Sequence, residues 1–167
     1  MGISVKSITL GSVLAGLCLA WWVPTNAAQP SGQAAAEVRT ACTELVLDYA
    51  FYRDRLDANA VGELFTEDAV MTVLGQVLTS RKAIQARIET GAGSATRHLM
   101  STIRIFQQSA DRASGVSYVM VVGAPPGDLP MKADGFLAVG EYHDQFVRTE
   151  AGWKISQRTF VPVFEPK

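Results

Sequence analysis

An apolar stripe near the start of the chain constrains the fold more than any other feature. From Ala36, apolar residues recur at alternating steps of four and three positions, namely Val38, Cys42, Leu45, Tyr49, Tyr52 and Leu56. This spacing places them on one face of an α-helix of about five turns. A helix of this kind buries its apolar face against another element, so the stripe predicts a second layer later in the chain.

The second layer is predicted to be a sheet. A shorter helix capped by Asn59 and a strand over residues 69–74 follow the first helix, and Thr79 or Ser80 caps a third helix over residues 81–89. The remainder of the chain is rich in β-branched residues and turn signals. Four further strands are predicted over residues 96–108, 113–122, 136–149 and 153–164. Helices followed by antiparallel strands indicate an α+β domain with the helices on one face of the sheet.

One domain is expected, because 167 residues suffice for a single sizeable core and no repeat or internal linker divides the sequence. The hydrophobic fraction is 48% and the charged fraction 19%, as in globular proteins. The formal net charge is −1, and no basic run or aromatic–basic stripe occurs. Nucleic acid is therefore not expected as a partner.

Residues 1–28 are predicted to be a signal peptide. Lys6 supplies a positive charge, an apolar run follows it, and small residues then suit cleavage after Ala27 or Ala28. A permanent membrane anchor is the alternative, but the apolar run is short and ends at Pro24. The protein is therefore expected to be periplasmic or secreted, with the membrane as a partner only before cleavage.

Cleavage would leave a flexible leader over residues 29–35 and one domain over residues 36–167. The mature chain would keep Cys42 alone, on the apolar helical face, so we expect an inert buried thiol and no internal disulfide. The two histidines, His98 and His143, are 45 positions apart and no cysteine pair accompanies them, so no metal site is predicted. The sequence has no phosphate-binding loop and no Gly-x-Ser-x-Gly motif, so no cofactor is predicted.

Five stretches in sequence order resemble the SnoaL-like proteins of the nuclear transport factor 2-like superfamily. They are the leading helix, LDANAVGELFTEDAV, SRKAIQARI, TRHLMS and GEYHDQFVRTEAGWKISQR. The resemblance implies a cone-shaped α+β barrel in which three N-terminal helices pack on a strongly curved, mostly antiparallel sheet and enclose an apolar pocket. It also implies a homo-oligomer, since relatives commonly associate through the outer face of the sheet. The fold hosts enzymes and plain binding modules alike.

The same resemblance implies catalytic residues. In dehydratases and a dehydrochlorinase of this superfamily, an aspartate late in the first helix orients a histidine near the start of a strand, and Asp57 and His98 match these positions. Bile-acid dehydratases also use a tyrosine five residues before the aspartate, matched by Tyr52, and an arginine of the last strand, for which Arg158 is the nearest match. Ser117 stands where scytalone dehydratase has a second histidine, which disfavours chemistry with two bases.

Each of these residues has a plainer alternative role. The neutral imidazole of His98 can accept a proton near neutral pH, but a strand histidine can also bind a backbone carbonyl. Asp57 can orient that imidazole, or it can bind local amides at a helix corner. Tyr52 lies on the apolar stripe, so it is a pocket hydrogen-bond donor or a core tyrosine.

Further side chains are predicted to line the pocket and bind the substrate, namely Tyr49, Tyr142 and Asp144. Arg158 would stabilise a leaving group or a developing enolate there. Its alternative role is a solvated arginine that pairs across the sheet with Glu141 or Asp144.

The predicted function is that of an exported, cofactor-independent lyase or isomerase whose His–Asp dyad abstracts a proton from a small apolar molecule. The alternative is a non-catalytic ligand-binding or dimerisation module of the same fold. Geometry separates the two, because the enzyme requires His98 and Asp57 to lie within hydrogen-bond reach inside a closed pocket.

Overall fold

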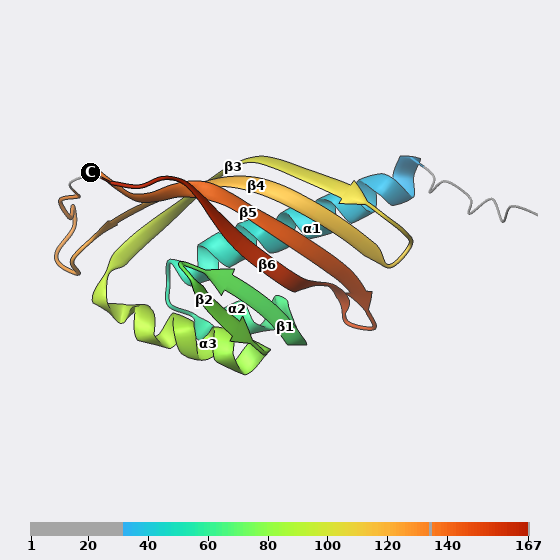
Figure 1. The fold of residues 1–167 in the computed structure, drawn as a ribbon, viewed down its shortest axis with the longest axis horizontal. Helices are drawn as coiled ribbons and strands as arrows, with labels where there is room; N and C mark the ends of the chain where they lie inside the picture. Colours follow the sequence, from blue (N-terminus) through green and yellow to red (C-terminus); the bar gives the residue numbers. More distant parts are fainter. Residues whose placement is uncertain (1–31, 134, 167) are drawn as a thin grey trace, which may run out of the picture.

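The computed structural model describes residues 32–133 and 135–166, and its fold is drawn in Figure 1. The predicted signal peptide, its cleavage site and the first residues of the predicted leader lie outside this range. Within it, no helix is long and apolar enough to cross a membrane.

The described elements follow the order of helices, then strands. They are α1 (Gly32–Arg53), α2 (Ala58–Glu63), β1 (Phe65–Val73), β2 (Gln76–Thr79), α3 (Arg81–Glu89), the 3₁₀ helix η1 (Thr90–Gly93), β3 (Ala95–Gln107), β4 (Arg112–Ala124), β5 (Phe136–Thr149) and β6 (Gly152–Phe164). Helix α1 begins four residues before the predicted start at Ala36, so residues 32–35 are helical rather than a flexible leader.

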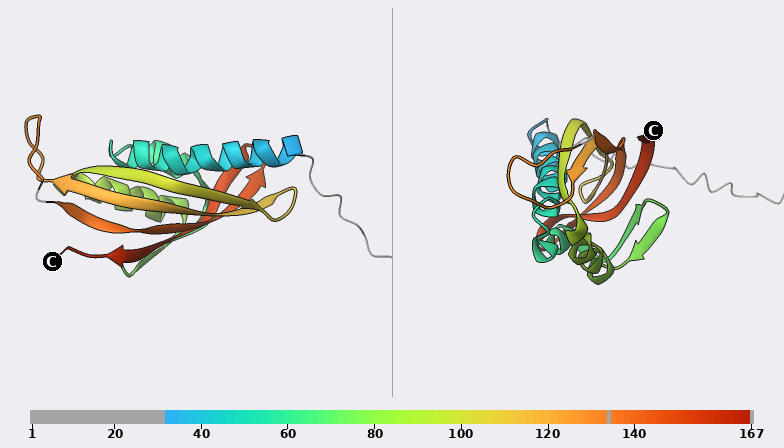
Figure 2. Two further views of the ribbon diagram at one scale, coloured as in Figure 1. Left: turned by 90° about the horizontal axis from the view of Figure 1, so that it is seen from above. Right: turned by 90° about the vertical axis from the view of Figure 1, so that its left-hand side faces the viewer.

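All six strands belong to one sheet, in the order β2-β1-β6-β5-β4-β3. Neighbouring strands are antiparallel except for β1 and β6, which are parallel. The sheet curves strongly and α1 lies along it, while α2 and α3 pack near β1 and β2 (Figures 1 and 2). The predicted α+β class is confirmed, with an open, curved sheet in place of a closed barrel.

The core lies between α1 and the sheet. Helix α1 buries residues spaced as on one helical face, namely Val38, Cys42, Val46, Tyr49 and Ala50. The strands β4, β5 and β6 bury alternate residues against this face, as the two-residue period of a strand requires. Each large apolar side chain removed from water in this way stabilises the fold by roughly 1.5–3 kcal/mol.

The corner between α1 and α2 differs from the prediction. Helix α1 ends at Arg53, and the chain then turns through Leu56, whose φ of 58° lies in the left-handed region. Asp57, rather than Asn59, is the N-cap of α2, because its Oδ1 accepts a hydrogen bond from the Ala60 amide at 2.9 Å.

Two further strand details were not predicted. Strand β1 begins at Phe65, so residues 66–68 are extended rather than a turn. The short strand β2 pairs with β1 across a turn at Gly75, whose φ of 77° suits glycine. Helix α3 has the predicted bounds, and Ser80 caps it.

Candidate active site

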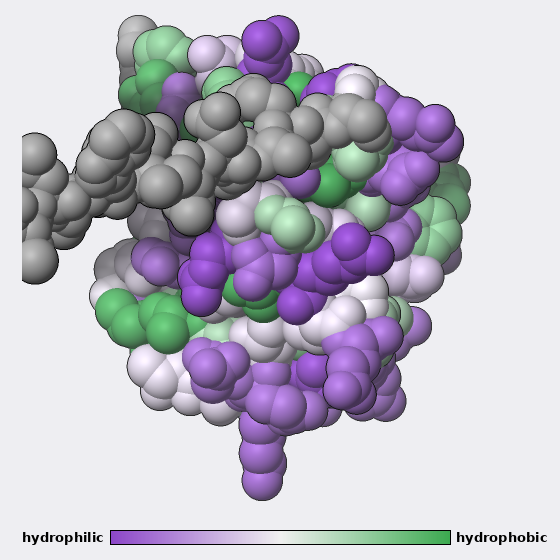
Figure 3. Space-filling view, turned by 90° about the vertical axis from the view of Figure 1, so that its right-hand side faces the viewer, coloured by the Kyte–Doolittle hydropathy of each residue, from purple (hydrophilic) through white to green (hydrophobic). Residues whose placement is uncertain are grey.

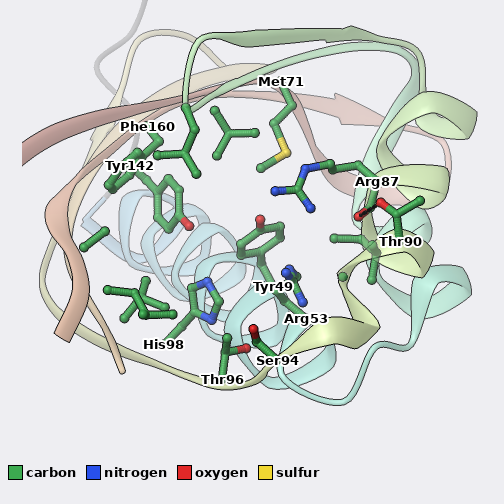
Figure 4. Close-up of a pocket in the computed structure, with 17 residues that line it drawn as sticks. Tyr49, Arg53, Met71, Arg87, Thr90, Ser94, Thr96, His98, Tyr142 and Phe160 are labelled. Carbon is green, nitrogen blue, oxygen red and sulfur yellow. Dashed lines mark hydrogen bonds between the residues drawn. The ribbon is translucent and has the colours of Figure 1, made fainter. Parts of the chain in front are cut away.

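A pocket of about 380 Å³ opens between α1, the α3–η1 segment and the curved sheet (Figure 4). It is lined by Tyr49, Arg53, Met71, Val73, Leu74, Arg87, Ile88, Thr90, Gly91, Ser94, Thr96, His98, Val121, Leu137, Ala138, Tyr142 and Phe160. Along the strands β1, β4, β5 and β6 the lining is apolar apart from the hydroxyl of Tyr142. Polar groups also come from α1, α3, the η1–β3 segment and β3. The face shown in Figure 3, at the end where α1 begins, is mostly hydrophilic.

His98 lies in the wall of this pocket and pairs with a buried carboxylate. That carboxylate belongs to Asp54, whose Oδ1 lies 2.6 Å from His98 Nδ1. Both side chains are 7% exposed. The chain therefore contains a His–Asp pair at the pocket wall, and its acidic member is Asp54.

Backbone geometry and a third residue hold Asp54 in place. Asp54 is the first residue after α1, where its side chain can reach β3. Its Oδ2 accepts the His98 backbone N–H at 2.8 Å, and its Oδ1 also accepts the Thr96 hydroxyl at 3.0 Å. Burial raises the pKa of Asp54, but the hydrogen bonds from His98 and Thr96 outweigh burial and hold that pKa below its ordinary value.

This network assigns the histidine tautomer. An ionised Asp54 can only accept hydrogen bonds, so the neutral His98 ring donates its Nδ1–H to Oδ1. The lone pair of the neutral ring is then on Nε2, and His98 lines the pocket. His98 can therefore accept a proton from a bound molecule.

The predicted pairing of His98 with Asp57 is wrong. Asp57 is exposed and caps α2. This is its alternative role from the sequence analysis, in which the side chain binds local amides at a helix corner. The predicted pocket role of Tyr52 is not supported either. Among the described residues that line the pocket, Tyr52 is missing, and its ring packs edge-on against Phe51 at 5.3 Å between centroids.

Of the two tyrosines on the apolar stripe of α1, Tyr49 is the one that lines the pocket. Tyr49 precedes Asp54 by five residues, which is the spacing that the resemblance assigned to Tyr52 and Asp57. The site therefore keeps that spacing and lies three residues earlier in the chain. Tyr142 lines the same pocket, and its ring packs edge-on against Tyr49 with 5.7 Å between centroids.

Both phenols stay protonated at neutral pH. Burial raises the pKa of Tyr49, with a smaller opposing effect from Arg158. Burial also raises the pKa of Tyr142, and the neighbouring Tyr49 raises it further. Two neutral hydroxyl groups beside His98 are able to donate hydrogen bonds to a ligand.

Arg158 is a buried ion-pair partner rather than a solvated arginine. It donates from Nε and Nη2 to the two carboxylate oxygens of Asp144, both at 2.7 Å. The guanidinium carbon lies 4.2 Å from the ring centre of Tyr49 and 4.5 Å from that of Tyr142. Arg158 and Asp144 are absent from the described pocket lining, so the predicted pocket roles of both are corrected to support from behind the tyrosines.

Two arginines in the pocket wall were not predicted. Arg53 comes from α1 and Arg87 from α3, and Figure 4 shows both guanidinium groups pointing into the pocket. A signal for Arg53 was present in the sequence, because it lies four positions after Tyr49 and thus on the same helical face. Arg87 had no such signal, since the face of α3 that meets the pocket depends on packing.

The described residues offer little for a metal. No group of three or more His, Cys, Asp or Glu side chains among them could hold an ion. Cys42 is buried, as expected, and burial together with Asp144 raises its thiol pKa to about 12. This thiol is therefore protonated and unsuited to act as a nucleophile.

Residues 34–159 match the SnoaL-like domain family, in agreement with the resemblance. No protein of curated function matches the chain. A variant of Rv3472 from Mycobacterium tuberculosis, of unknown function, is 23% identical with a TM-score of 0.69, over 81% of this chain and 76% of that chain.

Two other solved structures carry activity names. A Novosphingobium aromaticivorans protein provisionally named a scytalone dehydratase is 21% identical (TM-score 0.68, 79% of this chain and 88% of that chain). A hexachlorocyclohexane dehydrochlorinase, LinA type 2, is 19% identical (TM-score 0.68, 81% of this chain and 98% of that chain). At these identities, the likeness shows a shared fold.

Proposed function

The chain belongs to the SnoaL-like domain family, and on this premise we propose that it is a cofactor-independent lyase or isomerase. His98 is the base, Asp54 orients it, and Tyr49 and Tyr142 donate hydrogen bonds to the substrate. The observation that carries this proposal is the 2.6 Å contact between His98 Nδ1 and Asp54 Oδ1 at the pocket wall.

The first step is transfer of a proton from a substrate carbon to His98 Nε2. The resulting imidazolium is stabilised by the carboxylate of Asp54 on the opposite nitrogen. The electron pair of the broken C–H bond then forms a carbon–carbon double bond as a leaving group departs, or it is delocalised onto a carbonyl oxygen. General-base assistance of this kind is typically worth roughly 10²–10⁴-fold in rate.

The tyrosines complete the step on the other side of the substrate. A hydroxyl of Tyr49 or Tyr142 donates a hydrogen bond to the leaving group or to the enolate oxygen, where negative charge develops. In an elimination, the proton on His98 leaves with the departing group. In an isomerisation, the same proton returns to a different carbon.

Behind the two rings, Arg158 carries a positive charge that Asp144 balances. We therefore assign Arg158 and Asp144 as positioning residues that keep the tyrosine rings in place, since neither lines the pocket.

Hydrogen–deuterium exchange tests the proposal before the natural substrate is identified. A panel of small ketones and β-substituted carbonyl compounds in D₂O is followed by ¹H NMR. We expect at least one compound to exchange or eliminate with wild-type protein, and His98→Gln to slow that reaction by roughly 10²–10⁴-fold. Asp54→Asn should also slow it, whereas Asp57→Asn, the matched change at the α2 cap, should react like wild type.

If wild type and His98→Gln act equally on every compound that reacts, the catalytic proposal is wrong. A non-catalytic ligand-binding module is then the better interpretation. Asp54 has a separate spectroscopic test because it acts through His98. The ¹⁵N shifts of the His98 ring should report an Nδ1–H tautomer in wild type and a mixture of tautomers in Asp54→Asn. A merely structural role for Asp54 would leave the tautomer unchanged.

Export and self-association remain proposals that rest on sequence alone. We propose that residues 1–28 direct the protein to the periplasm or the medium, and that the mature domain forms a homo-oligomer. N-terminal sequencing of the exported protein and its sedimentation velocity would test these two points separately.

A further inference from the structure

We propose that the pocket recognises a substrate with one oxyanion group, such as a carboxylate or sulfonate, at the end of an apolar body. Arg53 and Arg87 would bind the oxyanion. This inference deepens the proposed function by naming the substrate class, and the part that concerns reaction at His98 rests on it.

The two guanidinium groups share one part of the pocket. Arg53 comes from the last turn of α1 and Arg87 from the last turn of α3. Figure 4 shows both guanidinium groups on the side of Tyr49 away from His98, with that of Arg87 near the Tyr49 hydroxyl. The hydroxyl-bearing residues Thr90 and Ser94 line the pocket beside them. Two cations with neighbouring hydroxyl donors suit a planar or tetrahedral oxyanion.

The charges around the pocket are unbalanced. The described lining contains Arg53 and Arg87 and no aspartate or glutamate. Of the carboxylates nearby, Asp144 is balanced by Arg158, whereas the ionised Asp54 is bound by the neutral His98 and Thr96 and keeps its charge. Two arginines against this one carboxylate leave one positive charge in excess. The local field in the pocket is therefore positive, which favours an anionic ligand.

The two arginines of α3, Arg81 and Arg87, differ in whether they form ion pairs. Arg81, at the start of the helix, contacts Glu63 at 3.1 Å and Glu67 at 2.9 Å. Arg87, at the other end, has no ion pair with any described residue. Both arginines lie on α3, but only Arg87, in the pocket wall, leaves its hydrogen-bond donors available to a ligand.

Arg53 likewise has an atom without a partner. Its Nη1 is buried without a hydrogen-bond partner among the described residues, and buried donors of charged groups are costly to leave unpaired. The bare backbone of Gly91 makes room for this guanidinium, since a Cβ there would lie 2.9 Å from Nη2. A ligand oxyanion would give the unpaired donor its partner.

This arrangement gives the ligand a direction. The oxyanion would lie between α1 and the α3–η1 segment, and the apolar body would extend toward Leu137, Val121 and Phe160. An acidic C–H between the two ends would then lie beside His98. The predicted substrate thus changes from a mostly apolar molecule to an amphipathic one.

Two dyes that differ by a single group provide the test. 1-Anilinonaphthalene-8-sulfonate carries a sulfonate, and N-phenyl-1-naphthylamine is the same molecule without it. Fluorescence titrations of the wild-type domain should give about tenfold tighter binding of the sulfonate dye, with the preference reduced by added NaCl. The double variant Arg53→Gln, Arg87→Gln should bind both dyes with similar affinity.

The matched control is Arg148→Gln, which removes the same charge from an exposed residue at the end of β5. It should keep the preference. Far-UV circular dichroism checks that the double variant is folded, and binding of the neutral dye measures whether its pocket is intact.

No preference in wild type, no binding of the sulfonate dye, or a preference that survives in the double variant would each overturn the inference. So would an equal loss of the preference in Arg148→Gln. Neither dye reacts, so these outcomes are independent of the exchange experiment. A failed exchange test with a retained dye preference would reject the catalysis and keep the oxyanion site.

Discussion

The buried carboxylates of Asp144 and Asp54 each bind a basic side chain, but the two pairs differ in what they leave accessible to the pocket. Asp144 and Arg158 are paired through both carboxylate oxygens, with 1% and 0% of their side chains exposed. Asp54 and His98 are each 7% exposed, and among the described residues only Nδ1 of the His98 ring has a hydrogen-bond partner. The first pair is closed within the core, whereas the second leaves an atom available to the pocket.

The difference follows from the chemistry of the two bases. A guanidinium is always charged and matches a carboxylate with a fork of parallel hydrogen bonds, so both carboxylate oxygens of Asp144 are bound within the core. Nη1 of Arg158 is also buried there, without a hydrogen-bond partner among the described residues. An imidazole has two separate nitrogens, and binding one of them orients the other. We infer that the closed pair, Asp144–Arg158, contributes to packing and that the open pair, Asp54–His98, is suited to reaction.

The largest expected effect is on the closed pair. Asp144→Ala leaves the charge of Arg158 buried and unpaired, so we expect it to lower the free energy of unfolding by about 3–5 kcal/mol. Urea denaturation measures this loss. Glu141→Ala is the control, since it removes an acid from the same strand whose His143 contact is partly exposed, and it should cost at most about 1 kcal/mol.

Replacing both members of the closed pair sharpens this result. Asp144→Ala combined with Arg158→Met removes the charge along with its partner, so the double variant should be more stable than Asp144→Ala alone. A double variant that is less stable than the single one would show that Arg158 is held by something other than Asp144.

The second prediction separates stability from activity in the two neighbouring aspartates. Asp54→Ala removes an acceptor from three buried donors, so it should cost about 1–3 kcal/mol of unfolding free energy. Asp57→Ala removes only a helix cap and should cost about 1 kcal/mol. In the exchange assay, Asp54→Ala should be impaired and Asp57→Ala should not. Equal activity of the two variants would contradict the assignment of Asp54 to the site.

These two aspartates also show why the sequence predicted the fold better than the site. Periodicity and turn chemistry located the three α-helices and five of the six strands, because a core requires a consistent apolar pattern over many residues. The site depends on where one helix ends. Continuing α1 to Leu56 favoured Asp57, whereas the helix ends at Arg53 and turns Asp54 toward β3.

The tyrosines were ambiguous for the same reason. Tyr49 and Tyr52 both lie on the apolar stripe, and each precedes an aspartate by five residues. Spacing alone cannot choose between them, since a shift of three residues preserves it. The choice is made by tertiary contacts, in which Tyr49 packs against Phe65 and Tyr142 while Tyr52 packs against Phe51.

The third prediction concerns acid. The pKa of Asp54 is lower in the folded protein than its ordinary value of 3.8, so the unfolded chain binds this proton more readily. The stability from Asp54 is therefore complete well above pH 3.8 and is lost as the pH falls through the folded pKa. Asp54→Asn lacks this dependence, so its deficit in unfolding free energy against wild type should shrink as acid is added.

Thermal unfolding followed across a series of acidic buffers measures this difference. The closed pair should not contribute to the same change through its cation. Burial lowers the pKa of Arg158, but Asp144, Tyr49 and Tyr142 together raise that pKa above its ordinary value. A deficit that stays constant down to the lowest pH would mean that the carboxylate of Asp54 gains nothing from His98 and Thr96.

The smallest expected effect tests how Arg53 is positioned in the pocket that His98 lines. Gly91→Ala would place a methyl group 2.9 Å from Nη2 and 3.2 Å from Nη1 of Arg53, so the guanidinium has to move. We expect the preference for the sulfonate dye to fall by about threefold, equivalent to about 0.6 kcal/mol. Stability should change by no more than about 0.5 kcal/mol, because the displaced group is the end of a flexible side chain.

Gly127→Ala is the matched control for this change, since a Cβ at Gly127 meets nothing within 4 Å. Both substitutions restrict the unfolded chain in the same way, so the difference between them isolates the contact with Arg53. If Gly91→Ala and Gly127→Ala show the same dye preference, the position of the Arg53 guanidinium does not matter for anion binding. The oxyanion would then depend on Arg87 alone, and the single variants Arg53→Gln and Arg87→Gln should differ accordingly.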